Sequence, residues 1–235
     1  MKPVLIFEHI PSSNPGLFRK FLEDRSLPYR IIHVNEGESL PLLDQLEEYS
    51  GLCFLGGTES VTQATKVMLQ EMDLIKHARK TGLPMIGHCL GGQLISKALG
   101  GEVKKNDVEE FGWSALAVCE SREARQWLTG NQDEFHAMQW HSDTFSIPPG
   151  ATRILSGEYC ENQAFVLDNI LAMQFHIEID LDTIMHWALD LSEKHPPKDA
   201  GTQSGPEIVD ETEHKFAVSS QLAIQLYQHW LEHLG

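Results

Sequence analysis

Short apolar runs alternate with amphipathic helical patterns along residues 1–100. Each run has the length of a buried strand, and the segments between the runs repeat their apolar positions every three or four residues, as one face of a helix does. This alternation predicts right-handed βαβ crossovers and a mostly parallel sheet. The expected strands cover residues 4–7, 31–34, 52–55 and 84–88, and the expected helices cover 16–24, 42–49, 67–80 and a segment that starts at 90.

After residue 101 the rhythm changes to strand-like runs joined by short loops, some of them expected to pair antiparallel. We expect an α/β three-layer sandwich with a central, mostly parallel sheet, built as one domain over residues 1–192. Residues 193–235 are expected to add a polar loop and a C-terminal helix packed on the same domain, and a helix that docks a partner is the alternative. The later strands are expected at 113–119, 134–138, 152–156, 164–167 and 171–175, a helix at 181–194, an exposed loop at 195–211 and the last helix at 216–234.

The chain is acidic, with a net charge of −16 over 235 residues. Such a surface repels nucleic acid and anionic membranes, so neither is an expected partner. The four cysteines have no C-x-x-C spacing, which argues against a zinc site or a disulfide framework. No apolar run is long enough to span a membrane, and no signal segment is recognisable, so we expect a cytoplasmic protein whose thiols stay reduced.

The most informative motif is G-H-C-L-G-G-Q over residues 87–93, which follows an apolar run and precedes a helical pattern. A cysteine between glycines at a strand-to-helix turn is typical of a nucleophile on a sharp elbow, because glycines permit a tight turn and close approach of a substrate. The helix that starts at Leu90 directs free N–H groups at the sulfur, which stabilises a thiolate and prepares a site for an oxyanion. The pattern favours Cys89 as a nucleophile over the alternative, a buried structural cysteine.

A cysteine nucleophile needs a base, and the segment Q-F-H-I-E over residues 174–178 offers one after another apolar run. His176 and Glu178 are two residues apart, so on a strand their side chains face the same side. Glu178 would then orient the imidazole, which completes a nucleophile, base and orienter. From the pattern alone, a strand-edge histidine beside a surface glutamate is equally consistent, since the chain has 12 histidines. No histidine or cysteine spacing matches a metal site, and no metal is expected.

Four further segments accompany these two motifs in a fixed order: a Gly-Gly loop at residues 56–57, Q-W-H-S-D-T-F at 139–145, Pro-Pro-Gly at 148–150 and N-Q-A-F at 162–165. In this order the segments resemble class I, triad-type glutamine amidotransferases, especially the stand-alone GMP synthase-like members, whose motifs are G-x-C-x-G-x-Q and F-H-P-E. The resemblance covers residues 1–190 and implies a flavodoxin-like sheet flanked by helices.

The resemblance also implies a role for each matching residue. Cys89 would attack the side-chain amide of glutamine, His176 would shuttle the proton, and Glu178 would orient His176. The backbone N–H groups of Gly57 and Leu90 would form the oxyanion hole. The glutamine-binding wall would contain Gln93, His141, Ser142 and Asp143.

Two positions depart from the family pattern. Ile177 stands where proline is usual, which loosens the backbone but leaves both polar neighbours in place. Gly92 stands where close relatives often have histidine, and we expect an altered pocket shape rather than lost chemistry.

The resemblance implies an enzyme that hydrolyses glutamine without a cofactor and releases ammonia for an acceptor. The expected partners are a second copy of the chain, in a homodimer, and a synthase subunit. No P-loop motif is present, and a fused synthetase would need a much longer chain. One alternative is a γ-glutamyl peptidase or hydrolase that uses the same residues on a γ-glutamyl conjugate. Another is a non-catalytic binding or regulatory subunit, against which the presence of all three residues argues.

Overall fold

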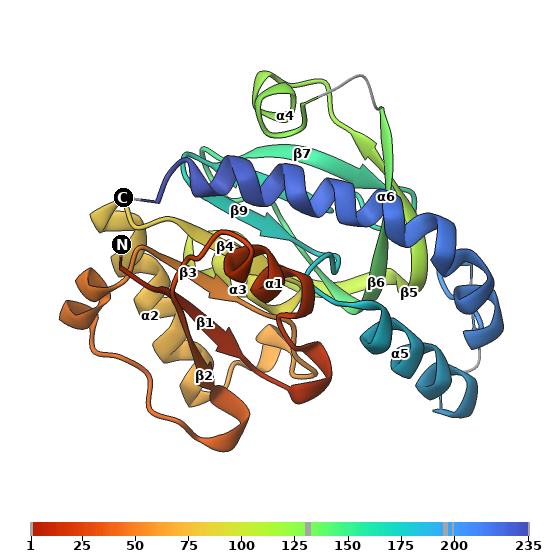
Figure 1. The fold of residues 1–235 in the computed structure, drawn as a ribbon, viewed down its shortest axis with the longest axis horizontal. Helices are drawn as coiled ribbons and strands as arrows, with labels where there is room; N and C mark the ends of the chain where they lie inside the picture. Colours follow the sequence, from red (N-terminus) through yellow and green to blue (C-terminus); the bar gives the residue numbers. More distant parts are fainter. Residues whose placement is uncertain (1, 130–132, 195–196, 199, 235) are drawn as a thin grey trace.

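The computed structural model describes residues 2–129, 133–194, 197–198 and 200–234. At its centre lies a nine-stranded sheet in the order β2-β1-β3-β4-β9-β8-β7-β5-β6, with helices on both faces (Figure 1). This arrangement confirms the expected α/β sandwich. The strands are β1 (Val4–Glu8), β2 (Tyr29–His33), β3 (Gly51–Phe54), β4 (Met85–His88), β5 (Val103–Val118), β6 (Glu134–Phe145), β7 (Thr152–Gly157), β8 (Ala164–Leu167) and β9 (Ile170–Met173). The α-helices are α1 (Gly16–Glu23), α2 (Lys66–Thr81), α3 (Leu90–Ala98), α4 (Arg122–Trp127), α5 (Leu181–Lys194) and α6 (Gly205–Leu231).

The half of the sheet from β2 to β9 is parallel, as the alternating pattern predicted. Strands β1, β3, β4 and β9 are buried along their whole length. Helices cover both faces of these strands, which explains why they read as continuous apolar runs in the sequence. The expected helical segment 42–49 is a 3-10 helix over Leu43–Glu48. The carboxyl ends of the parallel strands share one edge, where ligands bind in sheets of this kind.

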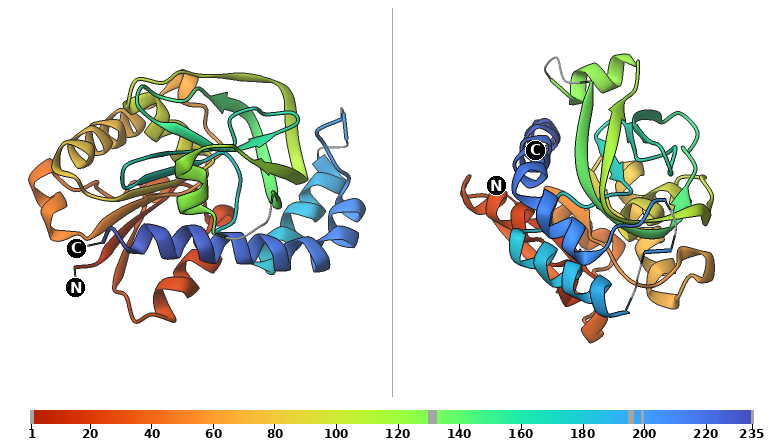
Figure 2. Two further views of the ribbon diagram at one scale, coloured as in Figure 1. Left: turned by 90° about the horizontal axis from the view of Figure 1, so that it is seen from above. Right: turned by 90° about the vertical axis from the view of Figure 1, so that its right-hand side faces the viewer.

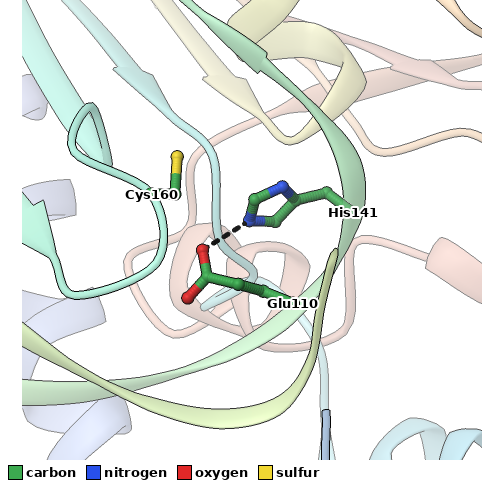
Figure 3. Close-up of side chains that lie close together, drawn as sticks. All are labelled: Glu110, His141 and Cys160. Atoms are coloured by element: carbon green, nitrogen blue, oxygen red, sulfur yellow. Dashed lines mark hydrogen bonds and ion pairs between the residues drawn. The ribbon is translucent and has the colours of Figure 1, made fainter. Parts of the chain in front are cut away.

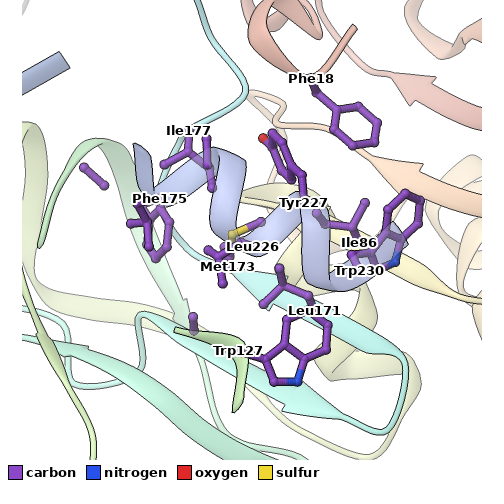
Figure 4. Packing of buried hydrophobic residues seen from close by; sticks show 14 of the residues in the cluster. Phe18, Ile86, Trp127, Leu171, Met173, Phe175, Ile177, Leu226, Tyr227 and Trp230 are labelled. Carbon is purple, nitrogen blue, oxygen red and sulfur yellow. The ribbon is translucent and has the colours of Figure 1, made fainter. Parts of the chain in front are cut away.

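Alternate residues of the parallel strands point to opposite faces and build two hydrophobic cores. On one face Ile6 joins the apolar side chains of α1 and α6, and on the other face Phe7 joins those of α2 and α3. Figure 4 shows the first core, in which Phe18, Tyr227 and Trp230 pack together. Burying each such aromatic side chain contributes on the order of 2 kcal/mol, so this face is a main source of stability.

The other half of the sheet is antiparallel and is dominated by the long pair β5 and β6, which curves along one side of the molecule (Figure 2). The sequence predicted only residues 113–119 and 134–138 as strand, whereas β5 has 16 residues and β6 has 12. The extension was missed because residues 103–110 are mostly charged or polar and carry no apolar signal. A register shift between Lys105 and Glu110 marks an irregularity in this extension.

The expected exposed loop over residues 195–211 is wrong for its second part, because α6 begins at Gly205. Ser204 caps the helix by accepting a hydrogen bond from the N–H of Glu207, and the Glu207 carboxylate accepts the N–H of Ser204 in return. Pro206 stands in the first turn, where proline is favoured. The segment before the cap pairs with β5, since the N–H of Phe111 donates to Gly201. Residues 195, 196 and 199 of the expected loop lie outside the described residues.

Helix α6 crosses the face of the sheet beside α1 and reaches α5 at its other end (Figure 1). Its apolar side chains enter the same core as those of α1. Trp127 of α4 belongs to the same core, and α4 contacts both β7 and α6. The polar face of α6 is exposed, which is the pattern of a helix packed along one side. Through α6, the C-terminal part of the chain reaches the back of β4, the strand that leads into the cysteine elbow.

Candidate active site

A cavity of about 460 Å³ opens at the carboxyl ends of the parallel strands. Of the residues predicted for the site, Cys89, Gly57, Gln93, His176 and the 141–143 segment line this cavity, whereas Glu178 lies fully buried behind His176. The structure therefore brings these residues into one place, whereas Leu90, predicted for the oxyanion hole, follows Cys89 as the first residue of α3 and is not among the lining residues. The lining consists of Ile10, Ser12, Ser13, Gly57, Thr58, Glu59, Ser60, Cys89, Gln93, Phe111, Trp140, His141, Ser142, Asp143, His176, Trp187 and Asp190.

Cys89 occupies a strained turn between β4 and α3. Its φ is +49° and its ψ is −108°, a conformation that side chains other than glycine rarely adopt. The sequence pattern pointed to the flanking glycines as the origin of the tight turn, but the cysteine itself carries the strain. The glycines are needed for close approach, since a Cβ on Gly91 would overlap the carbonyl group of Phe54. The turn is held because the N–H of Cys89 donates to the carbonyl of Met173 over 2.9 Å.

His176 and Glu178 form a buried pair just after β9. The Nδ1 of His176 lies 2.6 Å from Oε1 of Glu178, and the two side chains are 3% and 0% exposed. The N–H of His176 donates to the carbonyl of Met138 over 2.8 Å, which fixes the segment against β6. Burial alone would lower the pKa of His176, but the charges of Glu178 and of the Cys89 sulfur outweigh it and raise that pKa to about 10. The imidazolium form is therefore stabilised beside the cysteine.

Glu178 has a second histidine behind it, which the sequence pattern did not indicate. The Nε2 of His88 lies 3.9 Å from Oε2 of Glu178 and 3.0 Å from the hydroxyl of Tyr227 on α6. Burial lowers the pKa of His88 to about 4, so its ring is neutral. Burial alone would raise the pKa of Glu178, but the neighbouring imidazoles of His176 and His88 keep it below its usual value. Glu178 is therefore an ionised carboxylate in an apolar core.

One wall of the cavity is formed by the residues predicted to bind glutamine. The side-chain amide of Gln93 donates to the carbonyl of Asp143 over 3.3 Å. The hydroxyl of Ser142 donates to Glu109 over 3.0 Å, and the hydroxyl of Ser60 donates to the carboxylate of Asp143. Backbone and side-chain groups of this wall are thus locked in place around the space above Cys89.

A buried polar cluster behind this wall contains Glu110, His141 and Cys160, whose potential ligand atoms lie within 4.8 Å of one another (Figure 3). Among the described residues, this group has the donor types that could hold a metal ion. Each of the three residues already has a protein partner: His141 Nε2 lies 3.0 Å from Oε2 of Glu110, the amide of Gln163 donates to that same oxygen over 2.8 Å, and Cys160 lies 3.1 Å from Thr144. Oε1 of Glu110 is buried and has no hydrogen-bond partner among the described residues. The cluster fixes the ring of His141, and through it the wall.

The Gly-Gly loop after β3 lies against the site. A Cβ on Gly56 would stand 2.7 Å from Cε1 of His176, and a Cβ on Gly57 would overlap the side chain of Leu90. Neither glycine has a positive φ, and close packing is what requires glycine at both positions. Gly92 packs on the backbone of Met173, which leaves no room for a side chain at that position.

Three aromatic residues that line the cavity beside His176 were not predicted as part of the site. Trp187 of α5 packs edge-on against the imidazole with ring centres 4.9 Å apart, and Trp140 packs on Trp187 at the same distance. Phe111 follows at 5.6 Å from Trp140. Trp187 lies in the helical pattern of α5, and that pattern does not separate a residue that only packs in the core from one that also faces a cavity. We call these three residues the aromatic wall.

Comparisons with known proteins agree with this geometry. The model of the family glutamine amidotransferase class-I matches residues 17–187. A subunit of the glutamine-hydrolyzing GMP synthase of Sulfolobus acidocaldarius is 34% identical over 140 residues, which are 58% of this chain and 71% of that protein. The corresponding protein of Methanococcus maripaludis strain C5 is 33% identical over 161 residues, or 66% of this chain and 79% of that one.

Solved structures give the same result. A crystal structure of a glutamine amidotransferase from Methylobacillus flagellatus has a TM-score of 0.94 at 35% identity, covering 100% of this chain and 96% of that one. One from Thermotoga maritima has a TM-score of 0.84 at 27% identity, covering 98% of both chains. In the described part of this chain, no helix has the length and apolar character needed to cross a membrane. The chain belongs to the class-I glutamine amidotransferase family.

Proposed function

We propose that the protein hydrolyses the side-chain amide of glutamine through a thioester on Cys89. The sulfur attacks the amide carbon while the imidazole of His176 holds the proton. When the tetrahedral intermediate collapses, His176 gives that proton to the nitrogen, and ammonia leaves. Water then attacks the thioester with His176 as general base, which releases glutamate and the free thiol. Glu178 stabilises the imidazolium throughout.

The observation that carries the proposal is the placement of a strained cysteine and a carboxylate-paired histidine at one cavity. Cys89 Sγ lies 3.7 Å from the carbonyl of Trp140, and the amide of Gln174 donates toward it over 3.9 Å. His176 lines the same cavity, and its other nitrogen is occupied by Glu178. A nucleophile, a base with a fixed tautomer and an enclosed space are what amide hydrolysis of this type requires.

Two backbone N–H groups would stabilise the oxyanion of the tetrahedral intermediate. Leu90 is the first residue of α3, so its N–H has no acceptor within the helix. Gly57 lines the cavity and is in close contact with Leu90, which supports a shared oxyanion site at this position.

The test is release of glutamate from glutamine by the purified protein. Cys89→Ala is expected to abolish release, and His176→Ala to reduce it close to background. Cys119→Ala is the matched control, since Cys119 does not line the cavity, and it should keep full activity. Binding of glutamine without turnover by the parent protein would instead favour the non-catalytic binding subunit.

We propose further that ammonia passes to an acceptor on a synthase subunit. The names of the two relatives, each a subunit of a glutamine-hydrolyzing GMP synthase, support this. A nucleophilic thiol must stay reduced, which favours the cytoplasm as the compartment. Affinity capture from a lysate of the native host, followed by size-exclusion chromatography, distinguishes a complex with a synthase subunit from a homodimer. Recovery of the monomer alone would count against both partners.

The aromatic wall supports a second candidate function, hydrolysis of γ-glutamyl conjugates. The leaving nitrogen must lie beside His176 to receive its proton, and the ring next to that imidazole is Trp187. A substituent on the nitrogen would therefore contact Trp187 and Trp140, whereas the ammonia from glutamine leaves this surface unused. Comparison of kcat/KM for glutamine and γ-glutamyl anilides decides between the two. The conjugate is favoured if the anilides are the better substrates and if Trp187→Ala lowers their kcat/KM more than that of glutamine.

A further inference from the structure

A pair of polar side chains lies in the apolar core directly behind the proposed catalytic residues. His88 is the last residue of β4, and Tyr227 comes from α6, 139 positions later in the chain. Both are at most 1% exposed, and His88 Nε2 lies 3.0 Å from the Tyr227 hydroxyl. The ring of Phe18 packs edge-on against Tyr227 (Figure 4). Polar groups this deeply buried lower stability unless they have a specific partner, so their placement needs an explanation.

Glu178 provides that explanation. Its Oε1 is paired with His176, but its Oε2 is buried and has no hydrogen-bond partner within the described part of the chain. His88 Nε2 faces that oxygen from 3.9 Å. A buried carboxylate with one oxygen unpaired is costly, and an N–H dipole aimed at the free oxygen offsets part of that cost.

The charge of Glu178 decides which nitrogen of His88 carries the hydrogen. A neutral imidazole has one N–H, and a nearby carboxylate favours the tautomer with that hydrogen on Nε2. The N–H then lies between two oxygens, the hydroxyl of Tyr227 at 3.0 Å and Oε2 of Glu178 at 3.9 Å. The opposite tautomer would direct a lone pair at the carboxylate.

We propose that His88 is a positioning residue for the reaction: its Nε2–H stabilises the carboxylate of Glu178, and Tyr227 holds the ring of His88 in place. This rests on the proposed function, in which Glu178 orients the base. It also gives α6 a role, because the helix supplies the side chain that fixes His88. The C-terminal part of the chain thereby supports the site from the core that α1 and α6 build on one face of the sheet.

Four titratable groups face Glu178 from the elements packed around it: His176 on its own segment, His88 on β4, Cys53 on β3 and Tyr227 on α6. Burial raises the pKa of Cys53 and of Tyr227, so both stay neutral near pH 7. Of these four groups, the two imidazoles favour the charged form of Glu178, and a backbone hydrogen bond favours it as well. Loss of His88 should therefore raise the pKa of Glu178, and the carboxylate should protonate at a higher pH than in the parent protein.

The experiment follows the rate of Cys89 alkylation by iodoacetamide as a function of pH, with the labelled peptide identified by mass spectrometry. Glu178 supports the imidazolium of His176, which in turn supports the thiolate, so the acid limb of this profile depends on the Glu178 carboxylate. His88→Leu is expected to move the acid limb up by at least about half a pH unit. His88→Gln, whose amide N–H reaches the same place, should restore at least half of that shift. His88→Asn is too short to do so and should behave as His88→Leu.

Phe18→Leu is the matched control, because it loosens the packing around Tyr227 and His88 but removes no polar group, and it should leave the acid limb in place. Near-ultraviolet circular dichroism checks that each variant is folded, and His88→Asn replaces His88→Leu if the latter is not. An unmoved acid limb in the folded His88 variants overturns the inference, as does a shift in the Phe18 control as large as theirs. Because alkylation needs no glutamine, a shifted limb in a protein that does not hydrolyse glutamine would overturn the proposed function alone.

Discussion

Replacing Glu178 by glutamine removes one charge while keeping the shape of the side chain. In the parent protein, the carboxylate accepts a 2.6 Å hydrogen bond from His176, and both groups are shielded from water. The amide of glutamine can still accept this bond, so the tautomer of His176 can persist. What disappears is the negative charge that stabilises the imidazolium formed during the reaction.

The size of the effect follows from burial. A hydrogen bond to a charged group contributes about 1.5–3 kcal/mol, and removing one partner of a buried pair costs about 3–5 kcal/mol because the other charge is left uncompensated. His88 also carries no charge that could replace the lost one. A loss of about 3–4 kcal/mol corresponds to a roughly hundred- to thousandfold lower kcat, at about 1.4 kcal/mol per factor of ten. His176→Ala should be more severe, because it removes the base itself.

The assay is glutamate release coupled to glutamate dehydrogenase under saturating glutamine. Glu8→Gln is the matched control, since Glu8 is also a largely buried carboxylate bonded to a histidine, His33, at 2.9 Å. That pair does not line the cavity, so the control should retain the activity of the parent. If Glu178→Gln kept activity within threefold of the parent, the reasoning about the buried charge would be refuted.

Three further predictions concern other parts of the site. Gly57→Val should lower turnover of glutamine by about a hundredfold or more, which is the scale of one lost oxyanion donor. It should slow alkylation of Cys89 by iodoacetamide only a fewfold, because that reaction forms no oxyanion. Equal losses in both reactions would remove Gly57 from the oxyanion hole. Tyr227→Phe should lower the free energy of unfolding in urea by about 1 kcal/mol, because it removes a buried hydrogen bond to His88, and unchanged stability would contradict that bond. The pKa of His176 is raised in the folded protein, so the pair adds stability that is fully present below the unfolded pKa of about 6.5 and is lost as the pH rises toward about 10. The pKa of Glu178 is lowered in the folded protein, so the pair adds stability that is present above about pH 4.5 and is lost in more acidic solution. The excess stability of the parent over Glu178→Gln should therefore be greatest between about pH 4.5 and 6.5, and a pH-independent difference would count against the pair.

The parallel half of the sheet and the cysteine elbow were predictable because both depend on local signals. Buried parallel strands need continuous apolar runs, and the elbow needs glycine at Gly91, where a Cβ would overlap a neighbouring strand. The side chains predicted for the site come together because the carboxyl ends of these strands share one edge. The start of α6 also has a local signal, the capping box formed by Ser204 and Glu207. The segment was predicted as a loop because the residues around this capping box are polar.

What the sequence did not reveal depends on contacts between distant segments. His88 is one of 12 histidines and follows an apolar run directly before Cys89, and nothing local distinguishes it from a core residue. The role proposed for His88 depends on its contact with Tyr227, which follows 139 positions later and reaches His88 only because α6 crosses the sheet. Trp187 likewise has ordinary helical spacing, and only the packing of α5 brings its ring to His176. Residues 103–110 read as a polar segment because the β5 extension has little apolar surface to bury.

The central claim is that Cys89 is the nucleophile, and covalent labelling by a glutamine-like diazoketone tests it most directly. The four cysteines compete in one experiment: burial raises the pKa of Cys53 and raises that of Cys160 to about 11, which makes both poor nucleophiles. Mass spectrometry of the digested protein should find the adduct on Cys89, far ahead of the other three thiols, and excess glutamine should suppress it. Equal labelling of all four cysteines, or labelling of Cys119 in preference to Cys89, would contradict the account.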